Sequence, residues 1–182
     1  MKNRQNGLGR FLRAVLPALG IALAGSLPFL LFREQISALP QYGYLGLLAA
    51  CFLTNATIFL PAAGIAFTLS AAAVLSPIPC ALIGGLGTAL GELVGYCFGR
   101  AGLRELPRRE KLARVYAFLE KWGYAAVFLF ALVPLPVFDA VGIAAGRARL
   151  SPVWFFLTCL AGKTLKMLAY VLAASALLPM WR

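Results

Sequence analysis

Four ionisable side chains lie inside apolar stretches of the sequence and are the residues best placed to carry chemistry. They are Glu92, Asp139, Lys163 and Lys166. A charge at membrane depth costs about 2.5–3.5 kcal/mol on insertion scales, so such residues usually pair or line a wet cavity. Two acids and two bases sum to zero, which permits internal pairing. The set predicts a path for a substrate or proton, with a structural Glu–Lys bridge between two helices as the alternative.

Glu92 belongs to a polar row, because residues four apart are neighbours on a helical surface. The row consists of Thr88, Glu92, Tyr96 and Arg100. A neighbouring row of small residues lets another helix approach closely. It consists of Gly87, Gly91, Gly95 and Gly99. On a second helix Lys163, Lys166 and Tyr170 share a face. We assign Tyr96, Arg100 and Tyr170, with the four buried charges, to the predicted path.

Asp139 follows Pro134 and Pro136, which interrupt an apolar segment. If a half-helix begins there, the carboxylate lies in its first turn, where free N–H groups and the helix dipole favour negative charge. Capping and a role in proton exchange or cation coordination near mid-membrane are both open. Asn55 and Pro61 mark the corresponding interruption of an earlier apolar segment.

The composition excludes most classes of soluble protein. Of 182 residues, 62% are hydrophobic and 13% are charged, whereas about 45–50% apolar residues are usual in soluble domains. The chain has no histidine, and its four cysteines are widely spaced without a C-x-x-C pair. The usual nucleotide-binding and hydrolase motifs do not occur. We expect a polytopic membrane protein that is not an enzyme and has neither a metal site nor a cofactor.

The net charge of +11 would suggest nucleic acid in a soluble protein, but here the cations flank the apolar runs. No basic patch is interleaved with aromatic residues as in base-stacking surfaces. The pattern predicts membrane topology, with membrane lipids bearing anionic head groups as partners and nucleic acid excluded. The sequence leaves proton coupling and a homodimer open.

Landmarks in the second half of the chain repeat those of the first. The motif L-x-x-aromatic-G-Y occurs at Leu39–Tyr44 and again at Leu119–Tyr124, an offset of 80. Further matches at an offset of 75, or 74 for the last, are Leu60-Pro61 with Leu135-Pro136, Leu75-Ser76-Pro77 with Leu150-Ser151-Pro152, Gly87 with Gly162, and Tyr96 with Tyr170. Shared Pro, Gly, Ser and Tyr residues in one order predict an internal duplication.

Each half contains an interrupted apolar segment, an L-S-P turn and a longer apolar helix, expected at about Ile78–Phe98 and Val153–Leu178. The predicted fold is an all-α polytopic membrane protein with an inverted repeat, in which each half is a re-entrant helical hairpin plus a transmembrane helix. The expected parts are a cytoplasmic N-terminus with an extra transmembrane helix (1–38), a first repeat (39–99), a basic cytoplasmic amphipathic link (100–118) and a second repeat (119–182).

Charge placement favours hairpins that do not cross the membrane. If both interrupted segments re-enter, thirteen cations lie on the cytoplasmic side, and Arg33 and Arg182 lie outside. If the second segment crossed, Arg147 and Arg149 would face outward, against the positive-inside rule. We therefore expect an integral protein of the cytoplasmic membrane of a prokaryote, with a cytoplasmic N-terminus.

Three stretches resemble the DedA family and its VTT-domain relatives, also called SNARE-associated Golgi proteins. They are G-x-x-x-G-E-L-V-G-Y-C-F-G-R-A-G at Gly87–Gly102, F-L-E-K-W-G-Y at Phe118–Tyr124, and V-P-L-P-V-F-D-A-V-G-I-A-A-G at Val133–Gly146. The resemblance implies two re-entrant hairpins facing each other from opposite leaflets. It also implies lipid movement, since known members include eukaryotic lipid scramblases and bacterial proteins that return undecaprenyl phosphate across the membrane, some driven by the proton-motive force.

Glu92, Pro134, Pro136 and Gly146 fall on positions of the family pattern. The chain departs from that pattern at three positions. Arginine in the family is replaced by Ala131 and Val137, and an acid of the first hairpin is replaced by Ile65. Lys163 and Lys166 are the candidates to substitute for the missing arginines.

We expect a non-enzymatic transporter that moves a phospholipid or an undecaprenyl-phosphate-type carrier between leaflets. Lys163 and Lys166 would attract the phosphate, and Glu92 or Asp139 would exchange protons. One alternative is a proton-coupled exporter of small cations or drugs, in which Glu92 and Asp139 bind the substrate. The other is a structural membrane protein without transport.

Overall fold

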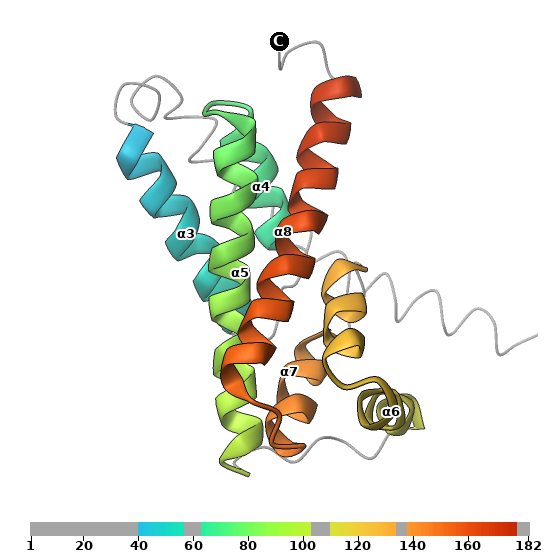
Figure 1. Ribbon diagram of the computed structural model, residues 1–182. Coiled ribbons are helices and arrows are strands. Elements are labelled where there is room, and N and C mark those ends of the chain that lie inside the picture. Colours follow the sequence, from blue (N-terminus) through green and yellow to red (C-terminus); the bar gives the residue numbers. More distant parts are fainter. Residues whose placement is uncertain (1–39, 57–62, 103–109, 134–137, 178–182) are drawn as a thin grey trace, which may run out of the picture.

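The computed structural model describes residues 40–56, 63–102, 110–133 and 138–177, and within these ranges the chain forms helices and no strands (Figure 1). The first half contains α3 (Pro40–Ala56), α4 (Ala63–Ala72) and α5 (Pro77–Arg100). Helices α3 and α4 run in opposite directions, and α5 then follows the whole length of the molecule. Pro77 begins α5 after the extended Ser76, a position where its fixed φ suits the first helical turn.

The second half repeats this order with α6 (Glu110–Leu132), α7 (Phe138–Arg147) and α8 (Pro152–Leu177). Helix α6 bends sharply at Gly123, where φ is 50° and ψ is −121°. Figure 1 shows its first part end-on, lying across the bundle, and its second part running along the bundle. Helix α7 returns antiparallel to that second part, and α8 leads back along the full length of the molecule.

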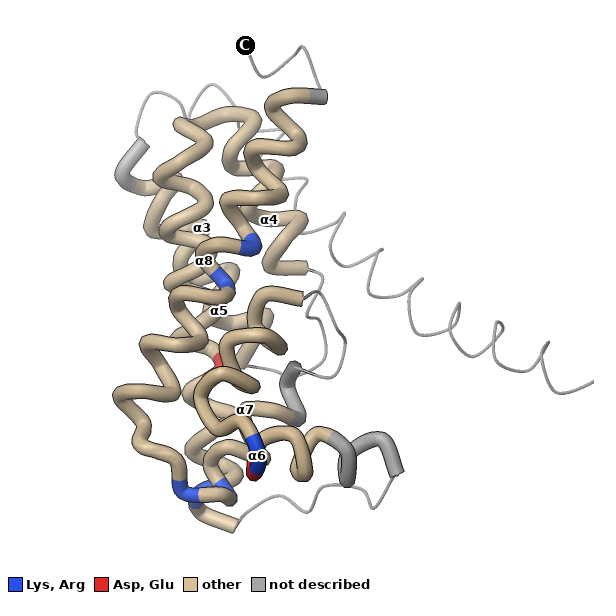
Figure 2. The backbone as a smooth tube through the Cα atoms, turned by 45° about the vertical axis from the view of Figure 1, so that its right-hand side comes forward, with Lys and Arg blue, Asp and Glu red and all other residues tan. Residues whose placement is uncertain are grey.

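Helices α5 and α8 pack against each other at the centre, and the two helical hairpins flank them from opposite ends. The charged residues of the described part lie at one end of the molecule, apart from Glu92 and the two lysines of α8 (Figure 2). We call this the basic end; it is defined by Arg100, Arg147 and Arg149.

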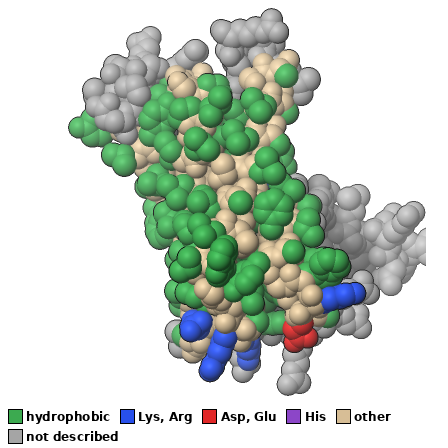
Figure 3. Space-filling view, viewed as in Figure 1, with side chains coloured by type: hydrophobic (Ala, Val, Ile, Leu, Met, Phe, Trp, Pro, Cys, Tyr) green, Lys and Arg blue, Asp and Glu red, His purple; other side chains and the backbone are tan. Residues whose placement is uncertain are grey.

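Each half has its own hydrophobic core, and α5 and α8 contribute to both. One core includes Phe67 and Met167, and the other includes Val127 and Phe155. Apolar side chains also cover most of the outer face in Figure 3. Such a surface is expected where a protein contacts lipid rather than water.

Among the residues that the structure describes, three helices are long and apolar enough to cross a membrane: Pro77–Arg100, Val115–Leu132 and Pro152–Ala176. The second contains the bend at Gly123, so it does not run as one straight rod. The prediction of an all-helical membrane protein is confirmed for the described part of the chain. The expected first transmembrane helix lies outside the described residues.

Candidate functional site at the helix crossing

The charged site lies where α5 and α8 cross. The Lys163 ammonium donates to Glu92 Oε1 at 2.7 Å, to Asn55 Oδ1 at 3.0 Å and to the Thr88 carbonyl at 3.1 Å. Glu92 is only 2% exposed and Lys163 only 3%. Three partners satisfy all three donors of an ammonium group. The internal pairing that the charge balance permitted is therefore present between Glu92 and Lys163.

The polar partners of Lys163 are themselves fixed. Asn55 donates through Nδ2 to the Cys51 carbonyl at 3.1 Å. The Thr88 hydroxyl donates to the carbonyl of Gly84 at 2.8 Å. The first bond orients the Asn55 amide so that its oxygen receives Lys163. The Thr88 carbonyl that receives Lys163 belongs to the backbone of α5, and the hydroxyl bond satisfies the Thr88 side chain within that helix. A buried pair of this kind gains little net stability over apolar residues, but losing one partner is costly.

Two glycines let the hairpins close over the site. A Cβ on Gly64 of α4 would lie 2.9 Å from Thr88 and 3.2 Å from the Asn55 side chain. A Cβ on Gly142 of α7 would lie 3.2 Å from Glu92 Oε2. The backbone of α7 thus lies against Glu92, and the backbone of α4 lies against Asn55 and Thr88, two residues that bind Lys163. The site is assembled from α3, α4, α5, α7 and α8, so both halves contribute to it.

The crossing joins two positions that the predicted internal repeat would make equivalent. Thr88 and Lys163 are 75 residues apart, which is the offset of the duplication, and they contact each other directly. Two related elements that cross on a two-fold axis bring equivalent residues together in this way.

Residues related by a constant offset in the sequence also make similar contacts where the outer helices pack. A Cβ on Gly87 would lie 2.7 Å from the Leu48 carbonyl oxygen and 2.9 Å from the Cys51 Cβ. A Cβ on Gly162 would lie 2.9 Å from the Phe128 carbonyl oxygen and 2.7 Å from the Ala131 Cβ. The contacted residues of α3 and α6 are 80 apart, the offset of the L-x-x-aromatic-G-Y motif. Helix α6 thus meets α8 as α3 meets α5.

At the basic end, two tyrosines hold the turn between α7 and α8. The Tyr96 hydroxyl donates to the Leu150 carbonyl and accepts from Arg100 Nη1 at 2.9 Å. The Ser151 amide donates to the Tyr124 hydroxyl at 2.8 Å. The Tyr96 ring stacks on Phe155 of α8, with 5.0 Å between centroids. We call the four hydrogen-bonded residues around this turn, Tyr96, Tyr124, Leu150 and Ser151, the tyrosine latch.

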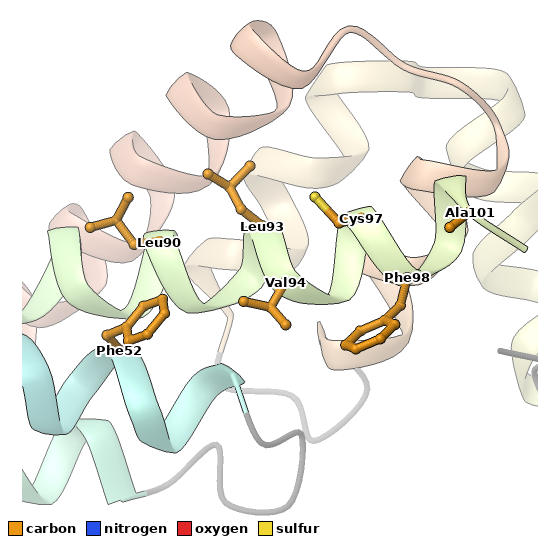
Figure 4. A pocket seen from close by; sticks show the side chains of 7 residues that line it. All are labelled: Phe52, Leu90, Leu93, Val94, Cys97, Phe98 and Ala101. Carbon is orange, nitrogen blue, oxygen red and sulfur yellow. The ribbon is translucent and has the colours of Figure 1, made fainter. Parts of the chain in front are cut away.

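An apolar groove of about 550 Å³ opens on the side of α5 (Figure 4). Phe52 of α3 lies at one end of it and Ala101, next to Arg100, at the other. The remaining lining residues are Leu90, Leu93, Val94, Cys97 and Phe98. The groove therefore runs along the bundle toward the basic end.

The structure brings some predicted site residues together and separates others. Glu92 and Lys163 form the pair, while Tyr96 belongs to the latch and Arg100 donates a hydrogen bond to it. Half-buried Lys166 and Tyr170 lie further along α8. Asp139 lies in the first turn of α7, and its side chain is outside the described ones. Pro61, Pro134 and Pro136 also lie outside the described residues.

Sequence reasoning missed two partners of Lys163. Asn55 was expected to mark a break; it lies in the last turn of α3, which ends at Ala56, and binds Lys163. The Thr88 carbonyl was not anticipated. The available signal was a lone amide in an apolar segment, which requires a partner when buried. Among the described residues no three Cys, Asp or Glu side chains come together as metal ligands.

Helices of spanning length, an apolar outer surface and a buried charged pair define a helical integral membrane protein. The family model of the VTT domain matches residues 54–176, more than half of the chain. The chain therefore belongs to the VTT-domain family. The VTT domain is the domain of the DedA and SNARE-associated Golgi proteins. Comparison with curated proteins and with solved structures finds no match.

Proposed function

We propose that this protein moves an anionic lipid, a phospholipid or a polyprenyl phosphate, between membrane leaflets. The observation that carries the proposal is Lys166, a half-buried cation in the middle of an apolar helix beside the Glu92–Lys163 pair. Charges at this depth mark substrate or ion pathways in membrane proteins. The family membership agrees with such a role.

The surroundings of Lys166 differ from those of its counterpart in the first half. At the offset of 74 that relates Tyr96 to Tyr170 its counterpart is Glu92, and at the offset of 75 that relates Gly87 to Gly162 its counterpart is Gly91. A Cβ on Gly91 would lie 2.6 Å from the Asn55 Cβ and 2.7 Å from the Phe52 carbonyl oxygen. A lysine side chain does not fit into such a contact, so we expect α6 to approach α8 less closely at this position. A half-buried ammonium at such a position suits a head group.

We further propose that α3–α4 and the second part of α6 with α7 are re-entrant hairpins of an inverted repeat. Tyr124, at the start of one hairpin, contacts Ser151, just after its end, so that hairpin begins and ends at the basic end. By the positive-inside rule the basic end would face the cytoplasm. This topology places the N-terminus in the cytoplasm and suits a prokaryotic cytoplasmic membrane.

In this proposal the two parts of a lipid follow different surfaces. The phosphate is attracted by Lys166, and the hydrocarbon chain lies in the apolar groove of α5, which leads toward Arg100. Proton exchange at Glu92 would weaken its bond to Lys163 and couple transport to a proton gradient. Asp139, at the start of α7, is a second candidate for proton exchange.

The test is transfer of a fluorescent anionic lipid between leaflets of reconstituted vesicles. Lys166→Met should slow transfer about tenfold, the effect expected for loss of a charged hydrogen bond. Lys121→Met, which removes an exposed cation at the basic end, serves as the matched control and should transfer normally. Transfer no faster than in empty vesicles would refute lipid movement, and normal transfer by Lys166→Met would remove this residue from the mechanism.

A structural role without transport is the second candidate. It is favoured by the complete set of hydrogen bonds around Lys163, which holds α3, α5 and α8 together. If it is correct, replacing Lys166 leaves cell function unchanged, while replacing Lys163 destroys the protein.

A further inference from the structure

The tyrosine latch has a sequence counterpart at the other end of the molecule. Leu150 and Ser151 correspond to Leu75 and Ser76 at an offset of 75. Tyr96 corresponds to Tyr170 at an offset of 74, and Tyr124 corresponds to Tyr44 at an offset of 80. Every residue of the latch is therefore present twice, in the positions that the duplication assigns.

The hydrogen bonds of the latch are present at one end only. Tyr96 and Tyr124 bind the turn before α8. Within the described ranges, which include Tyr44 and Tyr170, neither tyrosine is hydrogen-bonded to the turn before α5. Tyr44 packs against the apolar core that contains Leu75, so it already lies in the same region as that turn.

The backbones of the two turns differ as well. Helix α7 ends in a Schellman motif: the Leu150 amide donates to the Ala145 carbonyl at 3.2 Å and the Arg149 amide to the Gly146 carbonyl at 3.1 Å. Arg149 has a φ of 54°, a left-handed conformation that is strained for a residue with a Cβ. Its counterpart Val74 has no positive φ, and the Leu75 amide instead donates to the Ala71 carbonyl at 2.8 Å.

We propose that the protein alternates between two states in which the latch is exchanged between the two ends. In the state described here the basic end is latched. In the other state Tyr170 and Tyr44 bind the turn at Leu75–Ser76, and the turn at Leu150–Ser151 is released. Both halves carry the same residues, so each state forms the bonds that the other loses. The two states are therefore close in free energy, as a transporter that alternates between them requires.

Strain at Arg149 supports this exchange. A residue with a Cβ stays in the strained left-handed conformation only where contacts around it hold the backbone in place. The latch supplies those contacts. Releasing the latch allows Arg149 to relax, which offsets part of the loss of its hydrogen bonds. The proposal rests on the internal repeat and on transport as the proposed function, but not on the identity of the substrate.

The test measures the two ends separately by spin-label distances in vesicles. Exposed Cys97 is replaced by serine, while the three buried cysteines stay. One label pair, at Ala101 and Ala148, reports the basic end, and a second pair, at Ser76 and Ala173, reports the opposite end; all four positions are exposed. We expect each pair to show a short and a long distance, with the short one dominant at the basic end.

Removing single hydroxyl groups should change the ratio of these populations in opposite directions. Tyr124→Phe should raise the long-distance population at the basic end about fivefold, the shift expected from one net hydrogen bond. Tyr170→Phe should lower that population by a similar factor. Tyr96→Phe repeats the first test, but it alters a buried side chain, so Tyr124→Phe is decisive if that variant fails to fold. Tyr42→Phe, at an exposed tyrosine outside the latch, should change neither pair.

An unchanged ratio in Tyr124→Phe, or a shift in the same direction in Tyr170→Phe, would overturn the exchange. Lipid transfer measured in the same vesicles keeps the two proposals apart. Opposite shifts without lipid transfer would support the exchange and refute the lipid substrate. Lipid transfer with unchanged distances would do the reverse.

Discussion

The two halves of the molecule make the same helix crossing and then diverge one turn later. Gly87 and Gly162 meet equivalent residues of α3 and α6 at equivalent distances. The next position on α5 is Gly91, which continues the close contact with α3, whereas the equivalent position on α8 is Lys166. The first half thus has two successive glycines against α3, whereas the second half has Gly162 followed one turn later by Lys166.

The two outer helices, α3 and α6, also end at different positions. Helix α3 continues to Ala56, one turn beyond Phe52, whereas α6 ends at Leu132, the counterpart of Phe52. Pro134 follows in the sequence, and the residue before a proline disfavours helical geometry. The extra turn of α3 carries Asn55, which the second half lacks. The extra turn of α3 therefore supplies one of the three partners of Lys163.

This comparison separates the features that the two halves share from those in which they differ. Residues retained in both halves make turns and close crossings, which any copy of the fold requires. The charged residues at the centre differ, because Thr88 corresponds to Lys163 and Gly91 to Lys166. Function is therefore expected at the positions where the repeat is broken.

The largest effect is expected from comparing the two lysines of α8. Lys163→Met leaves Glu92 as an uncompensated buried charge and should lower the free energy of unfolding by about 3–5 kcal/mol. Lys166→Met, at the half-buried lysine, should change it by less than about 1 kcal/mol. Thermal unfolding in detergent measures both.

The double variant Lys163→Met with Glu92→Gln isolates the reason for this loss. It removes both charges together, so most of the stability should return. If the double variant is as unstable as Lys163→Met alone, packing around Lys163 rather than an unpaired carboxylate accounts for the effect.

The second effect tests whether the two crossings are equivalent. A methyl group on Gly87 or Gly162 would approach its neighbours within 2.7 Å, so each Gly→Ala change should cost about 1–3 kcal/mol. Gly46, which has no atom within 4 Å of its would-be Cβ, is the matched control on α3. Gly46→Ala should stabilise the helix by about 0.5–1 kcal/mol. A cost at Gly87 without one at Gly162 would break the equivalence.

The long helices could be predicted from sequence because local signals define them. The L-S-P turns place proline at the start of α5 and of α8, and both helices were expected within two residues of their observed bounds. The balance of charges in the sequence also predicted that buried acids and bases pair with each other. It did not predict that Glu92 pairs with Lys163 rather than with Lys166, because that depends on where α5 and α8 cross.

Other features depend on tertiary contacts that the sequence does not encode locally. Gly43 and Gly123 occupy the same place in the repeated motif, yet α3 continues through Gly43 while α6 bends at Gly123. The bend follows from the amphipathic first part of α6 lying across the bundle. Asn55 reaches Lys163 only because Gly87 and Gly91 bring α3 against α5. The latch likewise joins residues far apart in the chain.

The smallest effect concerns the strained turn at the basic end. Arg149→Gly removes the Cβ from a left-handed position and should stabilise the latched state by about 1 kcal/mol. Arg149→Ala is the control, because it removes the same charge and keeps a Cβ. The difference between the two variants, measured by thermal unfolding and by the Ala101–Ala148 distance, therefore reports backbone strain alone. If both variants behave alike, strain at Arg149 does not separate the two ends of the molecule, and the difference between them rests on the tyrosine hydrogen bonds.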